Sequence, residues 1–229
     1  MGDTTYPPSA LLASHAPAAA VPNGSCPGSL RTARSGPDVY GAWWEVRDDS
    51  SAILMVGRST DSGRTWSIVQ PADTSDHSRS GCTRPVPAVA ADSTTNYVDI
   101  AYFMEAKEGP GVFFTHSMDA RRIGSGDGVF HSPVAIVYGD KPANVAIAAR
   151  GDQVAVAYED PNGEQAIVGL ALSRTMGHIF EQRFVVSQPG LPAVDPLVAM
   201  HSDSVIVQWS ERPDSVLSGG RVAVRSAVW

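Results

Sequence analysis

Short runs of apolar residues with alternating polarity dominate the hydrophobic pattern of this chain. Such alternation over four to eight residues predicts β-strands, because successive side chains of a strand point to opposite faces. The most regular run occurs four times, each time ending in an aromatic residue with an acidic residue close behind: Val39–Glu45, Val98–Tyr102, Val154–Glu159 and Val205–Glu211. Its aromatic residues are Trp43, Tyr102, Tyr158 and Trp209, at spacings of 59, 56 and 51. Because helical periodicity is absent from these segments, the pattern predicts an all-β protein.

A second apolar run follows each of these after a polar loop: Ile53–Ser59, Gly111–Ser117, Ile167–Ser173 and Gly220–Ser226. The serines that end these runs are 58, 56 and 53 residues apart. Two independent sets of segments therefore recur with nearly the same period. A fixed period is typical of repeat architectures, so we interpret the chain as four copies of one all-β unit.

Shorter apolar segments complete each unit. Four precede the aromatic runs: Leu30–Arg34, Val86–Ala91, Val145–Ala149 and Leu197–His201. Three close a unit: Trp66–Gln70, Val134–Tyr138 and Phe184–Ser187. Four antiparallel strands per unit make a propeller blade. We predict a β-propeller of about four blades in a single domain, residues 29–229, with repeats at about 29–83, 84–140, 141–191 and 192–229.

The fourth unit reaches Trp229 directly after its third strand. Residues 1–28 form an N-terminal extension, and a strand within Ala10–Val21 would complete the fourth blade and close the propeller, because closure removes an exposed sheet edge. Two alternatives stay open: a flexible, Pro-rich leader and a short helix over Pro8–Ala20.

The segment from Ser59 to Trp66 reads S-T-D-S-G-R-T-W. It resembles the Asp box of the bacterial neuraminidase (BNR) repeat, S-x-D-x-G-x-T-W, with every defining position filled. Reduced forms recur at the repeat period in Ser117–Asp119 and Ser173–Phe180. On these motifs the chain is similar to the sialidase/neuraminidase-like superfamily over residues 30–229. The resemblance implies a sialidase-like propeller.

The motif residues Ser59, Asp61, Gly63, Thr65 and Trp66 have structural roles. Gly63 suits a tight turn that needs a positive φ, and Asp61 can accept hydrogen bonds from N–H groups of the turn. Trp66 would cover the blade core with a large apolar surface. In sialidase-like propellers the boxes lie at the periphery, so they indicate architecture rather than chemistry.

The resemblance implies where catalytic residues would lie. Sialidases bind the substrate carboxylate with three arginines and use a Tyr nucleophile assisted by a Glu, with an Asp acid/base. Arg31, in Leu30–Ala33, matches one of four positions of the family's F-R-I-P segment, and Arg84 lies at the corresponding point of the next unit. The two arginines could form an anion site; alternatively they pair with acids such as Asp38 and Asp92.

Other features of the family's active site are missing. No motif marks a tyrosine as nucleophile, and Tyr102 and Tyr158 belong to the aromatic positions expected in the core. Family enzymes have six blades, whereas this chain has material for four. We therefore assign no catalytic residue and expect no sialidase activity.

Cys26 and Cys82 are the only cysteines. They could be two free thiols, a weak metal site or one disulfide. Each lies a few residues before the first strand of consecutive units, and equivalent positions of neighbouring blades lie side by side. We therefore favour a disulfide, which implies an oxidising compartment.

Composition excludes several function classes. The net charge of −7 argues against nucleic-acid binding, which needs clustered Lys and Arg, and no apolar run approaches the roughly 20 residues of a membrane helix. The six histidines show no metal-ligand spacing. Gly124–Gly128 resembles phosphate and calcium loops but lacks their ligand pattern, so a surface hairpin is favoured. We expect no metal and no cofactor.

These observations predict a non-catalytic interaction or scaffold module that is periplasmic or secreted, although no signal peptide is visible. Its partner would be a protein, for example at the outer face of a membrane complex, or a glycan. The alternative is a reduced sialidase-like glycoside hydrolase, or a glycan-binding protein, that recognises an acidic sugar through Arg31 and Arg84.

Overall fold

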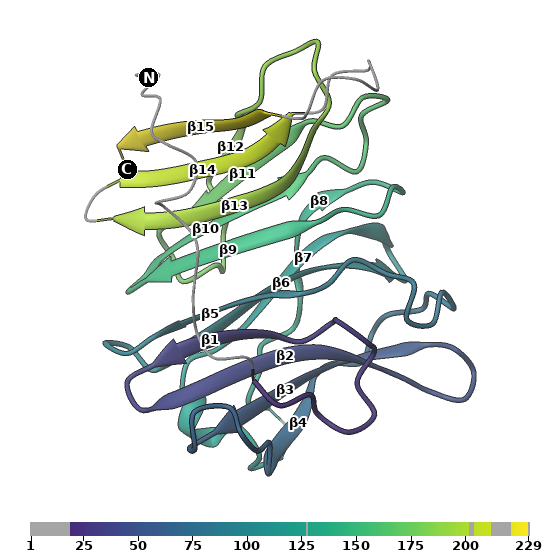
Figure 1. The fold of residues 1–229 in the computed structure, drawn as a ribbon, viewed down its shortest axis with the longest axis vertical. Coiled ribbons are helices and arrows are strands. Elements are labelled where there is room, and N and C mark those ends of the chain that lie inside the picture. Colours follow the sequence, from purple (N-terminus) through teal and green to yellow (C-terminus); the bar gives the residue numbers. More distant parts are fainter. Residues whose placement is uncertain (1–18, 127, 202–203, 212–220, 229) are drawn as a thin grey trace.

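The computed structural model describes residues 19–126, 128–201, 204–211 and 221–228, and their fold is all-β. The strands form four antiparallel sheets, and within each sheet they pair in chain order. The described residues also contain one 3₁₀ turn, η1 (Ala120–Arg122). In this part of the chain no helix has the length and apolar character to span a bilayer. Figure 1 shows the sheets following one another along the longest axis of the molecule.

Each sheet corresponds to one run of consecutive strands. The first sheet contains β1 (Arg31–Ser35), β2 (Asp38–Val46), β3 (Ala52–Ser59) and β4 (Ile68–Asp73). The second contains β5 (Ala88–Asp92), β6 (Tyr97–Ala106), β7 (Gly109–Ser117) and β8 (Val134–Tyr138). The third contains β9 (Val145–Arg150), β10 (Gln153–Glu159), β11 (Val168–Ser173) and β12 (Gln182–Val185). The fourth contains β13 (Ala193–His201), β14 (Ser204–Glu211) and β15 (Arg221–Val228).

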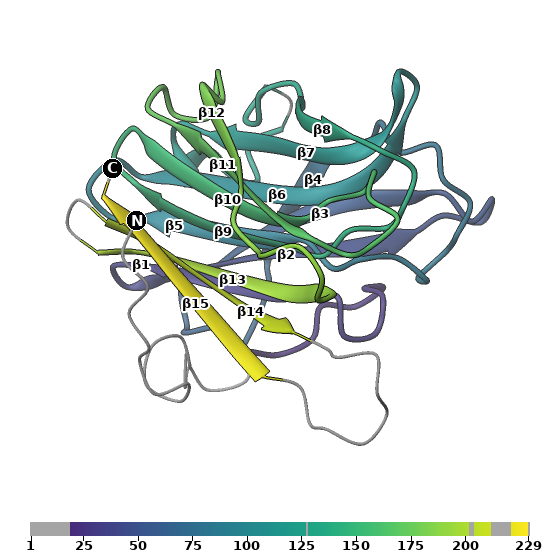
Figure 2. The ribbon, with the colours of Figure 1, turned by 90° about the horizontal axis from the view of Figure 1, so that it is seen from above.

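The prediction of an all-β chain built from four small antiparallel sheets is confirmed. Every strand overlaps one expected from the hydrophobic pattern, and only the ends differ by a few residues. The first strands lie side by side, with β1 against β5, β5 against β9 and β9 against β13. Seen from above, β8 and β12 lie together on one side, away from β1 and β13 (Figure 2). The sheets thus fan out like propeller blades, with first strands inside and last strands outside.

Residues of the central strands alternate between two cores. On β6, Ile100 and Tyr102 pack in the cluster shared with the first sheet, whereas Ala101 and Phe103 pack in the cluster shared with the third sheet. Both faces are buried because a sheet covers each of them. This explains why the second strand of a unit has a nearly continuous apolar sequence.

The recurring aromatic residues pack each sheet against the preceding one. Tyr102 lies in the core shared with the first sheet, and its hydroxyl donates to Asp73 Oδ2 at 2.7 Å. Tyr158 lies in the core shared with the second sheet, and Trp209 in the core shared with the third. All of these side chains are buried, as expected for core positions.

The fourth sheet has three strands in the described part of the chain. On β14 the side chains of Val205, Val207 and Trp209 are buried, whereas the alternating residues are half-buried. The N-terminal strand expected to complete this sheet falls largely on residues 1–18, outside the described residues. Ala20, at the end of that segment, donates its N–H to the carbonyl of Gly63 at 2.8 Å and so lies against the first sheet.

Candidate functional site

The turn between β3 and β4 is held by hydrogen bonds within itself. Asp61 Oδ1 accepts from the backbone N–H groups of Arg64 and Thr65 at 3.0 Å each, and Oδ2 accepts from the Thr65 hydroxyl at 2.8 Å. Ser59 Oγ donates to Asp61 Oδ1 at 2.6 Å and accepts from Gly63 N at 2.8 Å. The Ser59 hydroxyl and then the Thr65 donors hold the pKa of Asp61 at about 2. The carboxylate therefore stays charged and fixes the turn.

Trp66 follows this turn and covers the face of the first sheet that points away from the second sheet. Its ring centroid lies 5.8 Å from that of Trp43, and its indole N–H donates to the carbonyl of Ala20 at 2.6 Å. Trp43 has no preceding sheet among the described residues. Trp66 and the chain at Ala20 take the place that a preceding sheet would have.

The equivalent turn in the third sheet, between β11 and β12, has a similar form with a different side-chain acceptor. Ser173 Oγ accepts from Gly177 N at 3.0 Å and from Thr175 N at 3.1 Å. Thr175 replaces the aspartate, and its hydroxyl oxygen accepts from Ile179 N at 3.1 Å. The serine and the glycine thus keep their roles in the turn, while the Glu181 carboxylate accepts from Arg174 N at 3.2 Å.

Three histidines meet beside this second turn. His116 is the penultimate residue of β7, His131 precedes β8, and His178 follows Gly177 in the turn. Ring centroids are 4.5 Å apart for His116 and His131, 4.8 Å for His116 and His178, and 5.3 Å for His131 and His178. One nitrogen of each ring lies within 4.8 Å of the other two. We call these residues the histidine cluster; it joins the second and third sheets.

The surroundings of His116 disfavour its charged form. Burial first, and then the neighbouring His131 and His178, lower the pKa of His116 to about 4. Asp99 lies behind it, with Oδ1 3.9 Å from His116 Nδ1. Burial and the charge of Asp92 raise the pKa of Asp99 to about 8. At neutral pH His116 is therefore neutral and its ring can offer a lone pair.

The histidine cluster opens into a cleft of about 270 Å³. Besides the three imidazoles, its walls are Phe114, Thr115, Ser132, Val134 and Gly177. His116 is buried, whereas His131 and His178 are exposed. Spacing along the sequence could not reveal the histidine cluster, because its members come from two sheets. The sequence offered one indication of a special role for His178, namely its position in a turn that repeats the motif of the first sheet.

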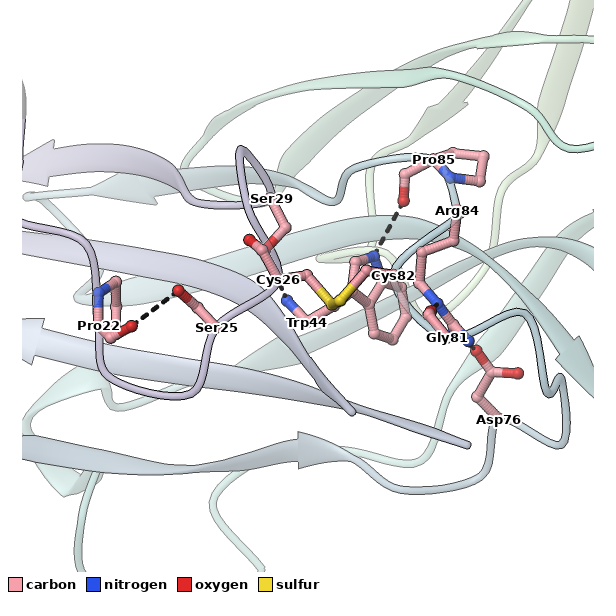
Figure 3. The surroundings of a disulfide bond; sticks show 10 residues. All are labelled: Pro22, Ser25, Cys26, Ser29, Trp44, Asp76, Gly81, Cys82, Arg84 and Pro85. Atoms are coloured by element: carbon pink, nitrogen blue, oxygen red, sulfur yellow. Dashed lines mark hydrogen bonds and ion pairs between the residues drawn. A yellow bond between two sulfur atoms is a disulfide. The ribbon is translucent and has the colours of Figure 1, made fainter. Parts of the chain in front are cut away.

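Arg84 lies in a different place, between the first and second sheets (Figure 3). Its guanidinium forms an ion pair with Asp76, and the two side chains are only 5% and 3% exposed. Arg84 Nε donates to the carbonyl of Gly81 at 2.7 Å, and the guanidinium carbon is 4.9 Å from the centroid of the Trp44 ring. The positive charge of Arg84 is thus paired with the Asp76 carboxylate inside the protein.

The predicted disulfide between Cys26 and Cys82 is present beside this ion pair (Figure 3). The two Cα atoms are 5.4 Å apart. Cys26 N donates to the carbonyl of Trp44 at 2.7 Å, and Trp44 Nε1 donates to the carbonyl of Pro85 at 2.9 Å. The bond therefore joins the chain before β1 to the loop before β5, as expected for equivalent positions of neighbouring units.

Arg31 has surroundings unlike those of Arg84. It is exposed at the start of β1, and Nη1 donates to the carbonyls of Gly28 and Leu30 at 2.9 Å each. The acids suggested as alternative partners are engaged elsewhere: Asp38 pairs with Arg58 at 2.8 Å, and Asp92 accepts from Thr94 at 2.8 Å. One arginine is at the surface and the other is in a buried ion pair.

The acidic residues that end the second strands also have internal partners. Glu45 Oε1 accepts from Trp43 Nε1 at 2.9 Å, and Glu211 Oε1 accepts from Trp209 Nε1 at 3.2 Å. Glu159 accepts from Asn144 Nδ2 at 3.1 Å and from the backbone N–H of the next sheet's Asp195 at 2.8 Å. These carboxylates tie strand ends and neighbouring sheets together.

Known structures with a similar fold are propeller glycoside hydrolases. Trypanosoma rangeli sialidase matches 87% of this chain and 36% of its own, with a TM-score of 0.56 at 13% identity. Penicillium chrysogenum alpha-L-arabinanase matches 90% of this chain and 65% of its own, with a TM-score of 0.58 at 12% identity. A GH43_12 enzyme from a capybara gut metagenome matches 89% of this chain and 40% of its own, with a TM-score of 0.54 at 11% identity.

These matches establish a sialidase-like propeller fold for the described sheets. This chain spans about a third of the sialidase and under two thirds of the arabinanase. No protein-family model and no curated protein sequence matches it. At such low identity the likeness concerns the fold and leaves the chemistry to be argued from the residues.

Proposed function

We propose that this protein is a non-catalytic interaction or scaffold module built on a sialidase-type propeller, with Ser59–Trp66 as an Asp box. The observation that carries the proposal is that Arg84, one of the two arginines that could form an anion site, is engaged in a buried ion pair. Arg84 is paired with Asp76 under Trp44. The hydrogen bonds of Asp61 support the assignment of the box, since they tie the turn as such a motif requires.

The proposal includes an extracytoplasmic location and a protein partner. A disulfide joins Cys26 and Cys82, and disulfides persist in oxidising compartments; the location would be periplasmic or secreted. Loops held by stiff sheets are suited to contact another protein, such as a subunit at the outer face of a membrane complex.

A second candidate function is glycoside hydrolysis or the binding of an acidic sugar. It is favoured by the structural neighbours, which include a sialidase in complex with sialic acid and an arabinanase complexed with arabinobiose. Arg31 is exposed and could contact a carboxylate. The buried ion pair of Arg84 weighs against a two-arginine site.

Activity and binding measurements separate the two functions. Purified full-length protein is incubated with a fluorogenic sialoside and with an arabinofuranoside, and sialic acid and arabinobiose are titrated by calorimetry. We expect no turnover above heat-inactivated protein and no saturable heat. The matched variants are Arg31→Ala and Arg34→Ala, both at exposed positions of β1. Turnover or sugar binding that Arg31→Ala abolishes and Arg34→Ala preserves would replace the scaffold proposal by the second candidate.

A further inference from the structure

The histidine cluster has the ligand types and spacing of a transition-metal site. His116 Nε2 lies 3.2 Å from His131 Nδ1. Two ligands of a tetrahedral zinc ion are separated by about 3.3 Å, because Zn–N bonds are about 2.0–2.1 Å long. One nitrogen of each of the three rings lies within 4.8 Å of the other two. The imidazoles of the exposed His131 and His178 would therefore have to turn for three nitrogens to surround one ion at tetrahedral distances.

Hydrogen bonds fix the backbone of His131 relative to that of His116. His131 N donates to the carbonyl of His116 at 2.9 Å, and the Thr115 hydroxyl donates to the carbonyl of His131 at 2.6 Å. These two bonds hold the loop before β8 against the end of β7. The positions of His116 and His131 are thus set by strand structure rather than by a free loop.

The tautomer of His178 leaves the lone pair of Nε2 available to bind a metal ion. Its Nδ1 is 2.7 Å from the carbonyl oxygen of Thr175. A carbonyl only accepts, so Nδ1 carries the proton and Nε2 holds the lone pair. Metal-ligating histidines usually donate their second ring N–H to a backbone carbonyl or a carboxylate in this way.

Asp99 is the carboxyl group nearest to His116 on the side away from the cleft. It lies 3.9 Å behind Nδ1, and its Oδ1 is buried with no hydrogen-bond partner among the described residues. An unpaired buried oxygen is costly unless something satisfies it. At 3.9 Å from Nδ1 this oxygen is beyond hydrogen-bond distance in the structure. The carboxyl group is therefore a neighbour of the histidine cluster and not one of its proposed ligands.

We propose that His116, His131 and His178 bind one zinc-class divalent ion between the second and third sheets, with the fourth coordination position open to the cleft. Imidazole ligands suit Zn²⁺, Cu²⁺ and Ni²⁺, whereas Ca²⁺ and Mg²⁺ require oxygen ligands. Sites with three protein ligands and one open position can also hold water or an exogenous ligand. The ion would link β7 of one sheet to the β11–β12 turn of the next.

The test uses full-length protein without an affinity tag, stripped with a chelator and titrated with Zn²⁺ by calorimetry. We expect one zinc per chain and, at a 100-fold excess over Kd, a rise in Tm of about 5–10 °C. His178→Gln removes one ligand from an exposed turn, so the fold should survive. It should weaken binding about tenfold or more, since even outer-shell changes at metal sites cost that much.

His77→Gln is the matched control, because His77 is exposed and lies outside the histidine cluster. It should bind zinc like the wild type, and Ca²⁺ at the same concentration should leave Tm unchanged. Absence of stoichiometric zinc, or equal affinity of the wild type and a folded His178→Gln variant, would refute the proposal. A Tm increase with Ca²⁺ equal to that with Zn²⁺ would refute it as well.

Discussion

The junction between the first and second sheets differs in chemistry from the junction between the second and third. The first is joined by the Cys26–Cys82 bond and by the buried pair of Arg84 and Asp76. The second is joined by aromatic packing of Phe114 on Phe180, with ring centroids 5.4 Å apart, and by the histidine cluster. At the first junction two opposite charges neutralise each other, although Arg84 Nη2 has no hydrogen-bond partner among the described residues, whereas at the second junction three imidazoles lie together.

The two repeated turns show how this difference arises. In the first sheet Asp61 satisfies the N–H groups of its own turn. In the third sheet Thr175 makes fewer bonds, and the next residues face the neighbouring sheet, where His178 meets His116. The turn that lacks the aspartate is therefore the one that contacts a neighbouring sheet through a histidine, His178.

Removal of the disulfide should have the largest effect. The double variant Cys26→Ala/Cys82→Ala frees a loop of 55 intervening residues and should lower the free energy of unfolding by about 4 kcal/mol, since the unfolded chain gains entropy. Denaturant unfolding measures this loss. Reduced wild-type protein should show the same decrease. A loss under about 1 kcal/mol would mean that the ion pair and packing hold this junction without the bond.

Replacement of Arg84 by Met should have the next largest effect. It leaves the carboxylate of Asp76 buried and unpaired, and breaking a buried pair costs about 3 kcal/mol or more. Chemical denaturation at pH 7 measures the cost. The exposed Arg34→Met on β1 is the control and should change stability by less than about 0.5 kcal/mol.

The pH dependence of Arg84→Met sharpens this prediction. Burial already raises the pKa of Asp76, with Arg84 opposing the rise, so the variant raises it further. When the pKa of a carboxyl group is higher in the folded than in the unfolded state, the free energy of unfolding falls as the pH rises from about 4 to the folded-state pKa. The difference in free energy of unfolding between variant and wild type should therefore become smaller toward pH 4. A difference independent of pH would assign the loss to packing on Trp44.

Alanine at the turn glycines should give the smallest effects, and unequal ones. Gly177 has φ +79° and Gly63 has φ +86°, so both substitutions cost about 1 kcal/mol of backbone strain. A Cβ at Gly177 would lie 2.0 Å from the Phe114 ring, whereas at Gly63 it would lie 3.0 Å from Ala19 Cβ. Gly177→Ala should therefore cost about 1–2 kcal/mol more than Gly63→Ala. Equal decreases in the free energy of unfolding of the two variants, measured by thermal unfolding, would show that the Phe114 ring moves away freely.

The strands and the disulfide could be predicted because they depend on local pattern and repeat position. The apolar run along β6 marks a strand, and equivalent places in consecutive units brought Cys26 and Cys82 together. Partners chosen by loop conformation could not be predicted. Arg84 pairs with Asp76, not with Asp38 or Asp92, because the loop before β5 folds back over Trp44.

The candidate site escaped prediction for a related reason. The histidine cluster depends on which edges of two sheets meet, and a repeat pattern gives the order of sheets but not the contacts of their turns. His116 and His178 are 62 positions apart, far beyond the spacing of local metal motifs. Only the packing of β7 beside the β11–β12 turn reveals the grouping.

The contact of Trp66 with Trp43 affects the stability of the first sheet. Linear arrays such as ankyrin or leucine-rich repeats remain folded because a terminal unit shields the last exposed face, and their stability is a sum of nearest-neighbour terms. The indole pair gives the first blade such a shield. Among the described residues, the first sheet is therefore covered on one face by the second sheet and on the other by its own Trp66.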